Sequence, residues 1–293
     1  MNRPVLSVVI PTRDRRETLM ATLRALNAQR EIDGRFEVIV VDDGSADGTS
    51  GVVRGSAFET FEHRVLVRDA GGPARARNRG IAEAAADRVL LLGDDTAPAP
   101  IALAAHLRAA GDDEVAVQGR IDWDPDEPVT DVMRFLAPAG PQFWFRGLTD
   151  GGEVPWSQVL GSNLSAPVRW FREEPFDERF TDACMEDTEL AWRWRRQGWT
   201  TRWSEHALCH HRHRYDSIEP FVQRQERTGR WARMAVASNW GMAAKLVLEP
   251  LAAFVWKAVK NGRWRVAGRG RDRDEWDLMC RRAYLRGLVT RSQ

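Results

Sequence analysis

Two apolar segments of this chain each end in a pair of adjacent aspartates. Residues 36–41 lead into Asp42-Asp43, and residues 88–93 lead into Asp94-Asp95. Apolar, β-branched runs of this length are typical of strands buried on both faces of a sheet. Two such strands would bring carboxylates to the carboxyl edge of the sheet, where oxygen ligands can hold a divalent cation and its phosphates. Paired aspartates also occur in ordinary turns and as helix caps, so the pairs alone leave both interpretations open.

Strand and helix patterns alternate along the first third of the chain. A strand is expected over residues 5–10, followed by a helix over 16–29, where leucines recur at helical spacing. A further strand is expected around 65–67, followed by a helix over 74–86. This alternation predicts an α/β fold whose sheet is mostly parallel and flanked by helices. Such sheets bind ligands at the carboxyl ends of their strands.

Composition limits the classes of protein to which the chain can belong. With 293 residues and 43% hydrophobic content, one large α/β domain with an appended helical part is expected. The net charge of +1 argues against a nucleic-acid-binding protein. Three scattered cysteines predict no disulfide framework and favour a reducing cytoplasm. The strand pattern begins at once, and no apolar run approaches the roughly 20 residues of a membrane span, so neither a signal peptide nor a spanning helix is expected.

Five short segments, in the order in which they occur, resemble the motif series of family 2 glycosyltransferases. They are Ser7–Thr12, Val40–Ser45, Gly72–Gly80, Leu91–Asp95 and Glu186-Asp187, the last followed by Leu190, Arg193 and Gly198. The resemblance extends from residue 5 to about residue 230. It implies a GT-A-like fold with a Rossmann-type, mostly parallel sheet, here with a C-terminal helical extension. It also implies an inverting sugar transfer from a nucleotide diphosphate, with Mg or Mn as the cofactor.

The same resemblance implies a set of residues that contact the nucleotide-sugar donor. Asp43 matches the position that contacts the base, and a carboxylate suits that task because it accepts hydrogen bonds from ring N–H groups. Gly93 stands where the family more often has an acidic residue, so Asp94 is expected to supply the ribose contact. Open N–H groups at the helix start after Gly72 favour phosphate. The expected donor-binding residues are Pro11, Thr12, Arg13, Asp42, Asp43, Gly72, Arg77, Asn78, Asp94 and Asn163.

Metal ligands are expected from two segments of the chain. The resemblance implies that Asp95 holds the divalent cation, together with His211 or His210 from the cluster Cys209–His213. Neighbours in an extended segment point to opposite faces, so one of these two histidines is expected to enter the site, with His211 preferred. A purely structural role for the histidines stays open. Zinc is not expected, because the paired ligand spacing of a structural zinc site is missing.

The predicted catalytic base lies at the start of a helix expected over residues 188–197. The resemblance implies that Asp187 deprotonates the acceptor hydroxyl, with Glu186 in a supporting or acceptor-binding role. Acidic side chains at this position also satisfy the open N–H groups of a helix start. A capping role is therefore the alternative interpretation.

We expect three parts along the chain. Residues 1–120 form the nucleotide-sugar-binding α/β half, residues 121–215 the acceptor-binding half of the same domain, with the catalytic base, and residues 216–293 a helical extension. From Lys257 to Gln293 the extension has 11 basic and four acidic residues, next to the apolar stretch Met242–Trp256. This pattern is compatible with peripheral contact to an anionic membrane, with a homodimer contact, or with helices packed on the catalytic domain.

The predicted function is therefore transfer of a sugar from a nucleotide diphosphate to an acceptor hydroxyl. A UDP-sugar is favoured because the family most often uses UDP, and the acceptor is a saccharide, a lipid-linked molecule or a small molecule. Two alternatives remain open: a catalytically inactive homologue that binds sugar nucleotides, and a sugar-phosphate nucleotidyltransferase. The latter would carry a Gly-rich loop where this chain has Pro11–Arg15. We expect a cytoplasmic enzyme, at the inner face of the membrane if the extension binds lipid.

Overall fold

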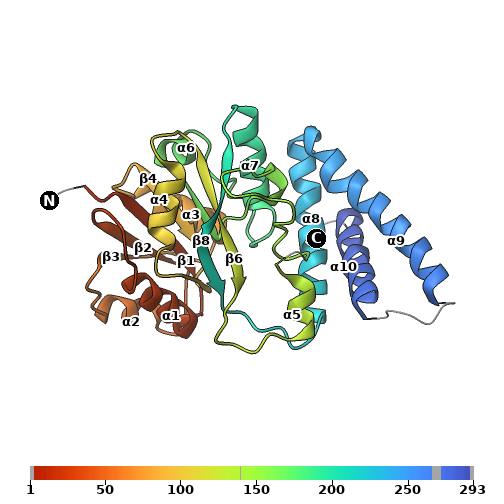
Figure 1. Ribbon diagram of the computed structural model, residues 1–293, viewed down its shortest axis with the longest axis horizontal. Coiled ribbons are helices and arrows are strands. Elements are labelled where there is room, and N and C mark those ends of the chain that lie inside the picture. Colours follow the sequence, from red (N-terminus) through yellow and green to blue (C-terminus); the bar gives the residue numbers. More distant parts are fainter. Residues whose placement is uncertain (1–2, 139, 266–271, 291–293) are drawn as a thin grey trace. The chain divides into compact units, whose positions relative to one another are not determined.

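A computed structural model describes residues 3–138, 140–265 and 272–290 of the chain (Figure 1). The chain divides into two compact units. The first consists of residues 1–129 and 136–214, and the second of residues 130–135 and 215–293. The second unit thus takes in a short segment from the middle of the chain, whereas the sequence pattern alone suggested a boundary only near residue 216.

The first unit is built on one eight-stranded sheet with the order β3-β2-β1-β4-β7-β6-β8-β5. Pairing is parallel between β1 and β2, β1 and β4, β2 and β3, and β6 and β8, and antiparallel for the other three pairs. The expected α/β class with a mostly parallel sheet is confirmed. The strands are β1 (Leu6–Thr12), β2 (Phe36–Asp42), β3 (Phe61–Val67), β4 (Arg88–Leu92), β5 (Thr96–Pro98), β6 (Ala116–Trp123), β7 (Asn163–Pro167) and β8 (Thr201–His211).

Helices cover both faces of the parallel half of this sheet. The core includes Leu6, Val8 and Ile10 of β1, packed with the leucines of α1 (Arg16–Asn27). On the opposite face, α3 (Pro73–Ala82) contacts β1 and β2, and it approaches so closely at Gly80 that an added Cβ would overlap Val9. Burial on both faces explains why these strands read as continuous apolar runs. The remaining helices of this unit are α2 (Thr49–Gly55), α4 (Ala102–Ala110), α6 (Val168–Glu173), α7 (Glu186–Arg196) and the 3₁₀ turn η1 (Trp156–Gln158).

Strand β1 runs two residues further than the apolar pattern suggested. It includes Pro11 and ends at Thr12, which pairs in register with Asp42 of β2. The backbone N–H of Asp43 then donates to the carbonyl of Thr12 at 2.9 Å. The β1–β4 ladder, by contrast, ends at Val9. The carboxyl end of the parallel strands is therefore staggered, and Thr12 reaches beyond the last paired residue of β4.

The second unit is helical. It contains α8 (Glu219–Ser238), η2 (Trp240–Met242), the π-helical turn η3 (Ala244–Leu248), α9 (Glu249–Arg265) and α10 (Asp272–Val289), and most of α5 (Asp131–Leu136) (Figure 1). Helices α8 and α10 pack backbone to backbone, because a Cβ at Gly229 or Gly287 would overlap a main-chain carbonyl of the other helix. Within the described ranges, no helix is long and apolar enough to cross a membrane.

A buried histidine joins α4 to the centre of the sheet. The Nε2 atom of His106 lies 2.8 Å from Oδ1 of Asn163, and its Nδ1 atom lies 3.1 Å from Oγ of Ser165. The amide of Asn163 donates to the carbonyls of Arg120 and Ala207, so its oxygen must accept from His106. Burial lowers the pKa of His106 to about 4. The ring is therefore held in its neutral form.

We expect His106 to make the protein acid-sensitive. The pKa of His106 in the folded state lies below the unfolded value of 6.5. The contribution of His106 to the free energy of unfolding is therefore fully present above the unfolded value of 6.5 and is lost as the pH falls through about 4. At about 1.4 kcal/mol per pKa unit the loss is about 3 kcal/mol. Urea unfolding between about pH 7 and about pH 4 should show a smaller loss in His106→Gln than in the parent. The matched variant His206→Gln changes an exposed histidine and should keep the parent's pH dependence. An equal loss of unfolding free energy with falling pH in all three proteins would show that His106 is not the cause of the acid sensitivity.

Candidate active site

The carboxylates that follow β4 lie at the carboxyl edge of the parallel strands. The hydroxyl of Thr12, at the end of β1, donates to Oδ2 of Asp94 at 2.9 Å. The hydroxyl of Thr22 on α1 donates to the main-chain oxygen of Asp94 at 2.8 Å. The side chains of Asp94 and Asp95 are only 8% and 16% exposed. Two nearly buried carboxylates are thus fixed side by side where the sequence predicted an acidic edge.

An arginine that the sequence analysis did not single out bridges this pair. The two terminal nitrogens of Arg15 donate to Oδ1 of Asp94 and to Oδ2 of Asp95, each at 2.8 Å. Arg15 lies in the loop that joins β1 to α1, and β1 is the neighbour of β4 in the sheet. The only sequence signal was an arginine just beyond a strand that neighbours the acidic strand. Among 43 lysines and arginines that signal is weak.

The two carboxyl groups of the pair have different environments. Burial raises the pKa of Asp94 to about 6, against the opposing charge of Arg15. Burial also works against ionisation of Asp95, but the charges of His211 and Arg15 outweigh it and hold the pKa of Asp95 below its ordinary value. Asp95 is therefore the more strongly ionised member of the pair at neutral pH.

The two candidate histidines lie at the end of β8. His211 pairs in register with Thr96 of β5, which places it beside Asp95, and its ring packs against Trp123 and Phe143. Its Nε2 atom lies 3.1 Å from Nε2 of Gln142. His210 is partly buried on the neighbouring position of the strand, where side chains alternate between faces. The charges of His211 and, to a smaller extent, His213 help to lower the pKa of Asp95. Of the two candidate histidines, His211 is thus the one that interacts with Asp95, which agrees with the preference for His211.

The donor atoms at this edge suit a divalent cation that is shared with phosphate. Among the described residues, no three His, Cys, Asp or Glu side chains are grouped closely enough to hold a metal ion by themselves. Mg²⁺, however, is usually bound through one or two carboxylates together with substrate phosphates and water. Asp94 and Asp95 supply such oxygens. The residues present therefore fit a cation that enters with a diphosphate, and not a protein-only metal site.

Asp42 and Asp43 order the loops beside this edge. Oδ1 of Asp42 accepts a hydrogen bond from the N–H of Ser45 at 2.8 Å, which forms a local turn. Asp43 is bound by Arg68 at 2.6 Å and by the N–H groups of Gly71 and Gly72, and so ties the end of β2 to the start of α3. Gly72 has a φ of 89° and abuts the main chain of Thr181, so a side chain would not fit there. The side chain of Arg13, by contrast, is 57% exposed, and its Nε atom lies 3.7 Å from Oδ2 of Asp14.

A buried ion pair connects α3 to the start of α7. Arg77 donates to Oε1 of Glu186 at 2.6 Å, and the two side chains are only 7% and 3% exposed. Burial and the neighbouring charge of Asp187 raise the pKa of Glu186, against the charge of Arg77. The remaining oxygen of Glu186 is buried without a hydrogen-bond partner among the described residues. The surroundings of Glu186, buried and paired with Arg77, are thus those of a residue that stabilises the fold.

Asp187, the expected base, is held at the surface of the same cluster. Its Oδ2 atom accepts from the N–H of Gly161 at 2.9 Å, and its Oδ1 atom accepts from the N–H of Thr188 at 2.8 Å. The next residue, Ser162, accepts a hydrogen bond from the N–H of Gly93 at 3.2 Å. Two adjacent residues, Gly161 and Ser162, therefore connect the expected base to the end of the acidic strand β4.

Two expected donor-binding residues bind the protein itself. Both atoms of the Asn78 amide bond to the main chain of Phe176, at 2.9 and 3.0 Å. Asn163 is fully buried and bonded to His106, Arg120 and Ala207. Asn163 nevertheless pairs in register with Leu92, two residues before Asp94.

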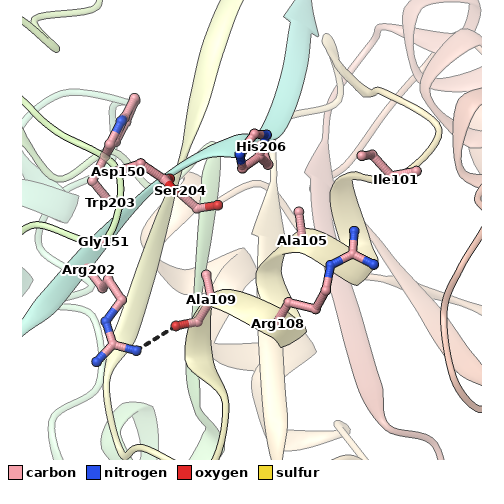
Figure 2. A pocket seen from close by; sticks show the side chains of 10 residues that line it. All are labelled: Ile101, Ala105, Arg108, Ala109, Asp150, Gly151, Arg202, Trp203, Ser204 and His206. Carbon is pink, nitrogen blue, oxygen red and sulfur yellow. Dashed lines mark hydrogen bonds between the residues drawn. The ribbon is translucent and has the colours of Figure 1, made fainter.

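A cavity of about 700 Å³ is lined by residues other than those described above (Figure 2). It is lined by α4, by the first half of β8 and by the loop at Asp150, and Figure 2 shows Arg202 donating to the main-chain oxygen of Ala109. Arg202 is also paired with Asp113, and Arg108 with Glu31. None of the site residues expected from the sequence lines this cavity. The candidate site is therefore defined by its chemistry and not by this hollow.

Removing the charge of Glu186 should destabilise the fold. In Glu186→Gln the guanidinium of Arg77 stays buried without a counter-charge, and the free energy of unfolding should fall by about 3 kcal/mol, as measured by urea denaturation. The control Glu178→Gln alters an exposed carboxylate 3.9 Å from Arg75 and should change stability by less than about 0.5 kcal/mol. Similar effects of both substitutions would show that the Arg77–Glu186 pair does not stabilise the fold.

The fold resembles solved structures of sugar-transferring enzymes. A mannosyltransferase from Pyrobaculum calidifontis, solved in complex with GDP-Man and Mn²⁺, superposes with a TM-score of 0.70 at 17% identity and covers 99% of this chain and 87% of that one. S. aureus TarS residues 1–349 in complex with UDP gives a TM-score of 0.54 at 18% identity, over 82% of this chain and 72% of that one. At such identities the likeness establishes the fold alone, which is of the GT-A type.

Sequence comparison adds the family. The chain is 32% identical over 219 residues to validoxylamine A glucosyltransferase of Streptomyces hygroscopicus subsp. limoneus, covering 65% of this chain and 48% of that protein. It is 30% identical over 239 residues to chondroitin synthase of Escherichia coli, covering 70% of this chain and 34% of that protein. The chain thus spans half or less of the length of these relatives. The sequence model of glycosyl transferase family 2 matches residues 7–180, more than half of the chain. The protein belongs to glycosyl transferase family 2.

Proposed function

We propose that this glycosyltransferase moves a sugar from a nucleotide diphosphate, with a UDP-sugar favoured, to an acceptor hydroxyl, with inversion and with Mg or Mn as cofactor. The observation that carries the proposal is the hydrogen-bonded link through Gly161 and Ser162, which joins Asp187 to the end of the strand that presents Asp94 and Asp95. A carboxylate base and an edge suited to a diphosphate are thereby neighbours. Solved proteins of this fold bind GDP-Man, UDP and UDP-GlcNAc, which supports a nucleotide-sugar donor.

The carboxyl edge would receive the donor. A divalent cation held by Asp94 and Asp95, with His211 or His210 beside them, would supply stabilisation of the negative charge on the departing diphosphate. Thr12 orients Asp94 through its hydroxyl group. Asp42 and Asp43 shape the loops at the end of β2, where we place the nucleotide. Pro11, Arg13 and Gly72 complete the proposed donor site. Arg77 and Asn163 support it from buried positions, and Asn78 supports it through its hydrogen bonds to Phe176.

Asp187 would act as the general base toward the acceptor hydroxyl. Two main-chain N–H groups fix its carboxylate, and an ionised carboxylate can accept a proton. Glu186 is buried against Arg77, so we assign it a supporting role in which it fixes the start of α7. With the base on the acceptor side and the leaving diphosphate on the metal side, direct displacement would invert the sugar carbon.

A donor screen tests this function against its two alternatives. The full chain is incubated with a panel of UDP-, GDP- and dTDP-sugars, with and without Mn²⁺, and nucleoside diphosphate release is measured. Slow metal-dependent release from one donor is expected. A catalytically inactive homologue would bind a donor, seen as a rise in melting temperature, without releasing nucleotide. A nucleotidyltransferase would instead form the sugar nucleotide from a sugar phosphate and a nucleoside triphosphate.

The helical unit offers a surface for a partner. Leu248, Leu251, Val255, Trp256 and Val259 are all exposed, and they recur at helical spacing from the end of η3 along α9. We propose that this surface meets either the inner face of a membrane or a second copy of the chain. The acceptor would accordingly be a saccharide, a lipid-linked molecule or a small molecule of the cytoplasm.

Replacing the base should separate turnover from binding. In Asp187→Asn we expect turnover to fall about 100-fold or more with donor affinity nearly unchanged, since proton transfer is lost while the proposed donor-binding residues stay as they are. One of the two main-chain hydrogen bonds to this side chain is also lost, so stability should drop by only about 1 kcal/mol. Asp87→Asn, at a carboxylate that is 81% exposed, is the matched control and should behave like the parent. Equal loss of donor affinity and turnover in Asp187→Asn would indicate a capping role.

A further inference from the structure

One arginine neutralises the carboxylates that the proposed function assigns to the divalent cation. The guanidinium group of Arg15 contacts Asp94 with one terminal nitrogen and Asp95 with the other, both at 2.8 Å. A fork of this kind normally grips the two oxygens of one carboxylate. Here it spans two neighbouring side chains. Arg15 thus supplies positive charge at the oxygens that a shared cation would use.

The loop around Arg15 is anchored independently of its guanidinium group. The main chain on either side of Arg15 is anchored: the N–H of Asp14 donates to Ser45 at 2.9 Å, and the N–H of Arg16 donates to Asp47 at 3.1 Å. The Arg15 side chain is 37% exposed, whereas the carboxylates behind it are nearly buried. Rotation about side-chain bonds would therefore move the guanidinium into solvent and open the two oxygens.

We propose that Arg15 is a positioning residue that competes with the divalent cation for Asp94 and Asp95, so that cation binding and release of the guanidinium are one event. This inference rests on the proposed function, which places a cation at the pair. Two buried carboxylates without a counter-charge repel one another and lose hydration, so the metal-free protein needs Arg15 to keep them in place. When a cation and a diphosphate enter, repulsion between the cation and the guanidinium at the same pair of carboxylates displaces the guanidinium.

The test measures Mn²⁺ binding to the nucleotide-free full chain by electron paramagnetic resonance at about pH 7.5. Arg15→Gln should bind Mn²⁺ at least about tenfold more tightly than the parent, because the competing cation is gone. The double variant Arg15→Gln/Asp95→Asn should lose that gain, which locates the ion at the pair. Arg79→Gln removes an exposed arginine that pairs with Glu83 and should match the parent.

Melting temperatures provide a second measurement. Without metal, Arg15→Gln should melt below the parent, and saturating Mn²⁺ should raise its melting temperature by more than it raises that of the parent. Unchanged or weaker Mn²⁺ binding in Arg15→Gln overturns the inference, as does a gain that survives in the double variant. The proposed function is decided separately, by whether the parent binds Mn²⁺ together with UDP. A parent that does so, alongside an Arg15→Gln variant without any gain, would refute only the role of Arg15.

Discussion

Burial of carboxylates without loss of their charge is the constraint on which the candidate site depends. Removing an ionised carboxylate from water is costly unless an opposite charge and hydrogen bonds replace the water. The site contains four buried carboxylates, and three arginines balance them: Arg15 at Asp94 and Asp95, Arg68 at Asp43, and Arg77 at Glu186. The parallel strands β2 and β4 bring the three aspartates to one edge, α7 supplies Glu186, and the arginines allow these carboxylates to remain buried.

Main-chain groups give this edge its order. Asp43 and Asp187 are each held by two backbone N–H groups. Both donors to Asp43 are glycines, Gly71 and Gly72, and one of the two donors to Asp187 is Gly161. At Gly161 an added Cβ would lie 3.3 Å from Cζ of Arg77 and 3.5 Å from Cβ of Asp187. The main chain there passes between the ion pair and the base. Glycine at this position therefore leaves room for the side chains of Arg77 and Asp187 close to the main chain.

Much of the fold and part of the site follow from local sequence patterns. Continuous apolar runs identified β2 and β4, because a strand covered by helices on both faces has no polar side. The aspartates at their ends lie where those patterns indicated. Element ends were less accurate: the helix expected over 74–86 ends at Ala82, and β1 continues to Thr12 because its pairing with β2 persists there. The segment 130–135 joins the helical unit through contacts that no local pattern encodes.

The sequence by itself determined which residue types stand at the ends of which strands. It therefore also determined that carboxylates would gather at one edge of the sheet, as the resemblance to family 2 glycosyltransferases implies. Only the tertiary structure decided which of the 43 basic residues balance those carboxylates. The partners are separated by 79 and 80 residues for Arg15, 25 for Arg68 and 109 for Arg77. Periodicity reports on neighbours within one helix or strand, whereas an ion pair depends on distance in space. The charge pairs across the site can therefore be identified only from the folded structure, in which distant segments of the chain lie close together.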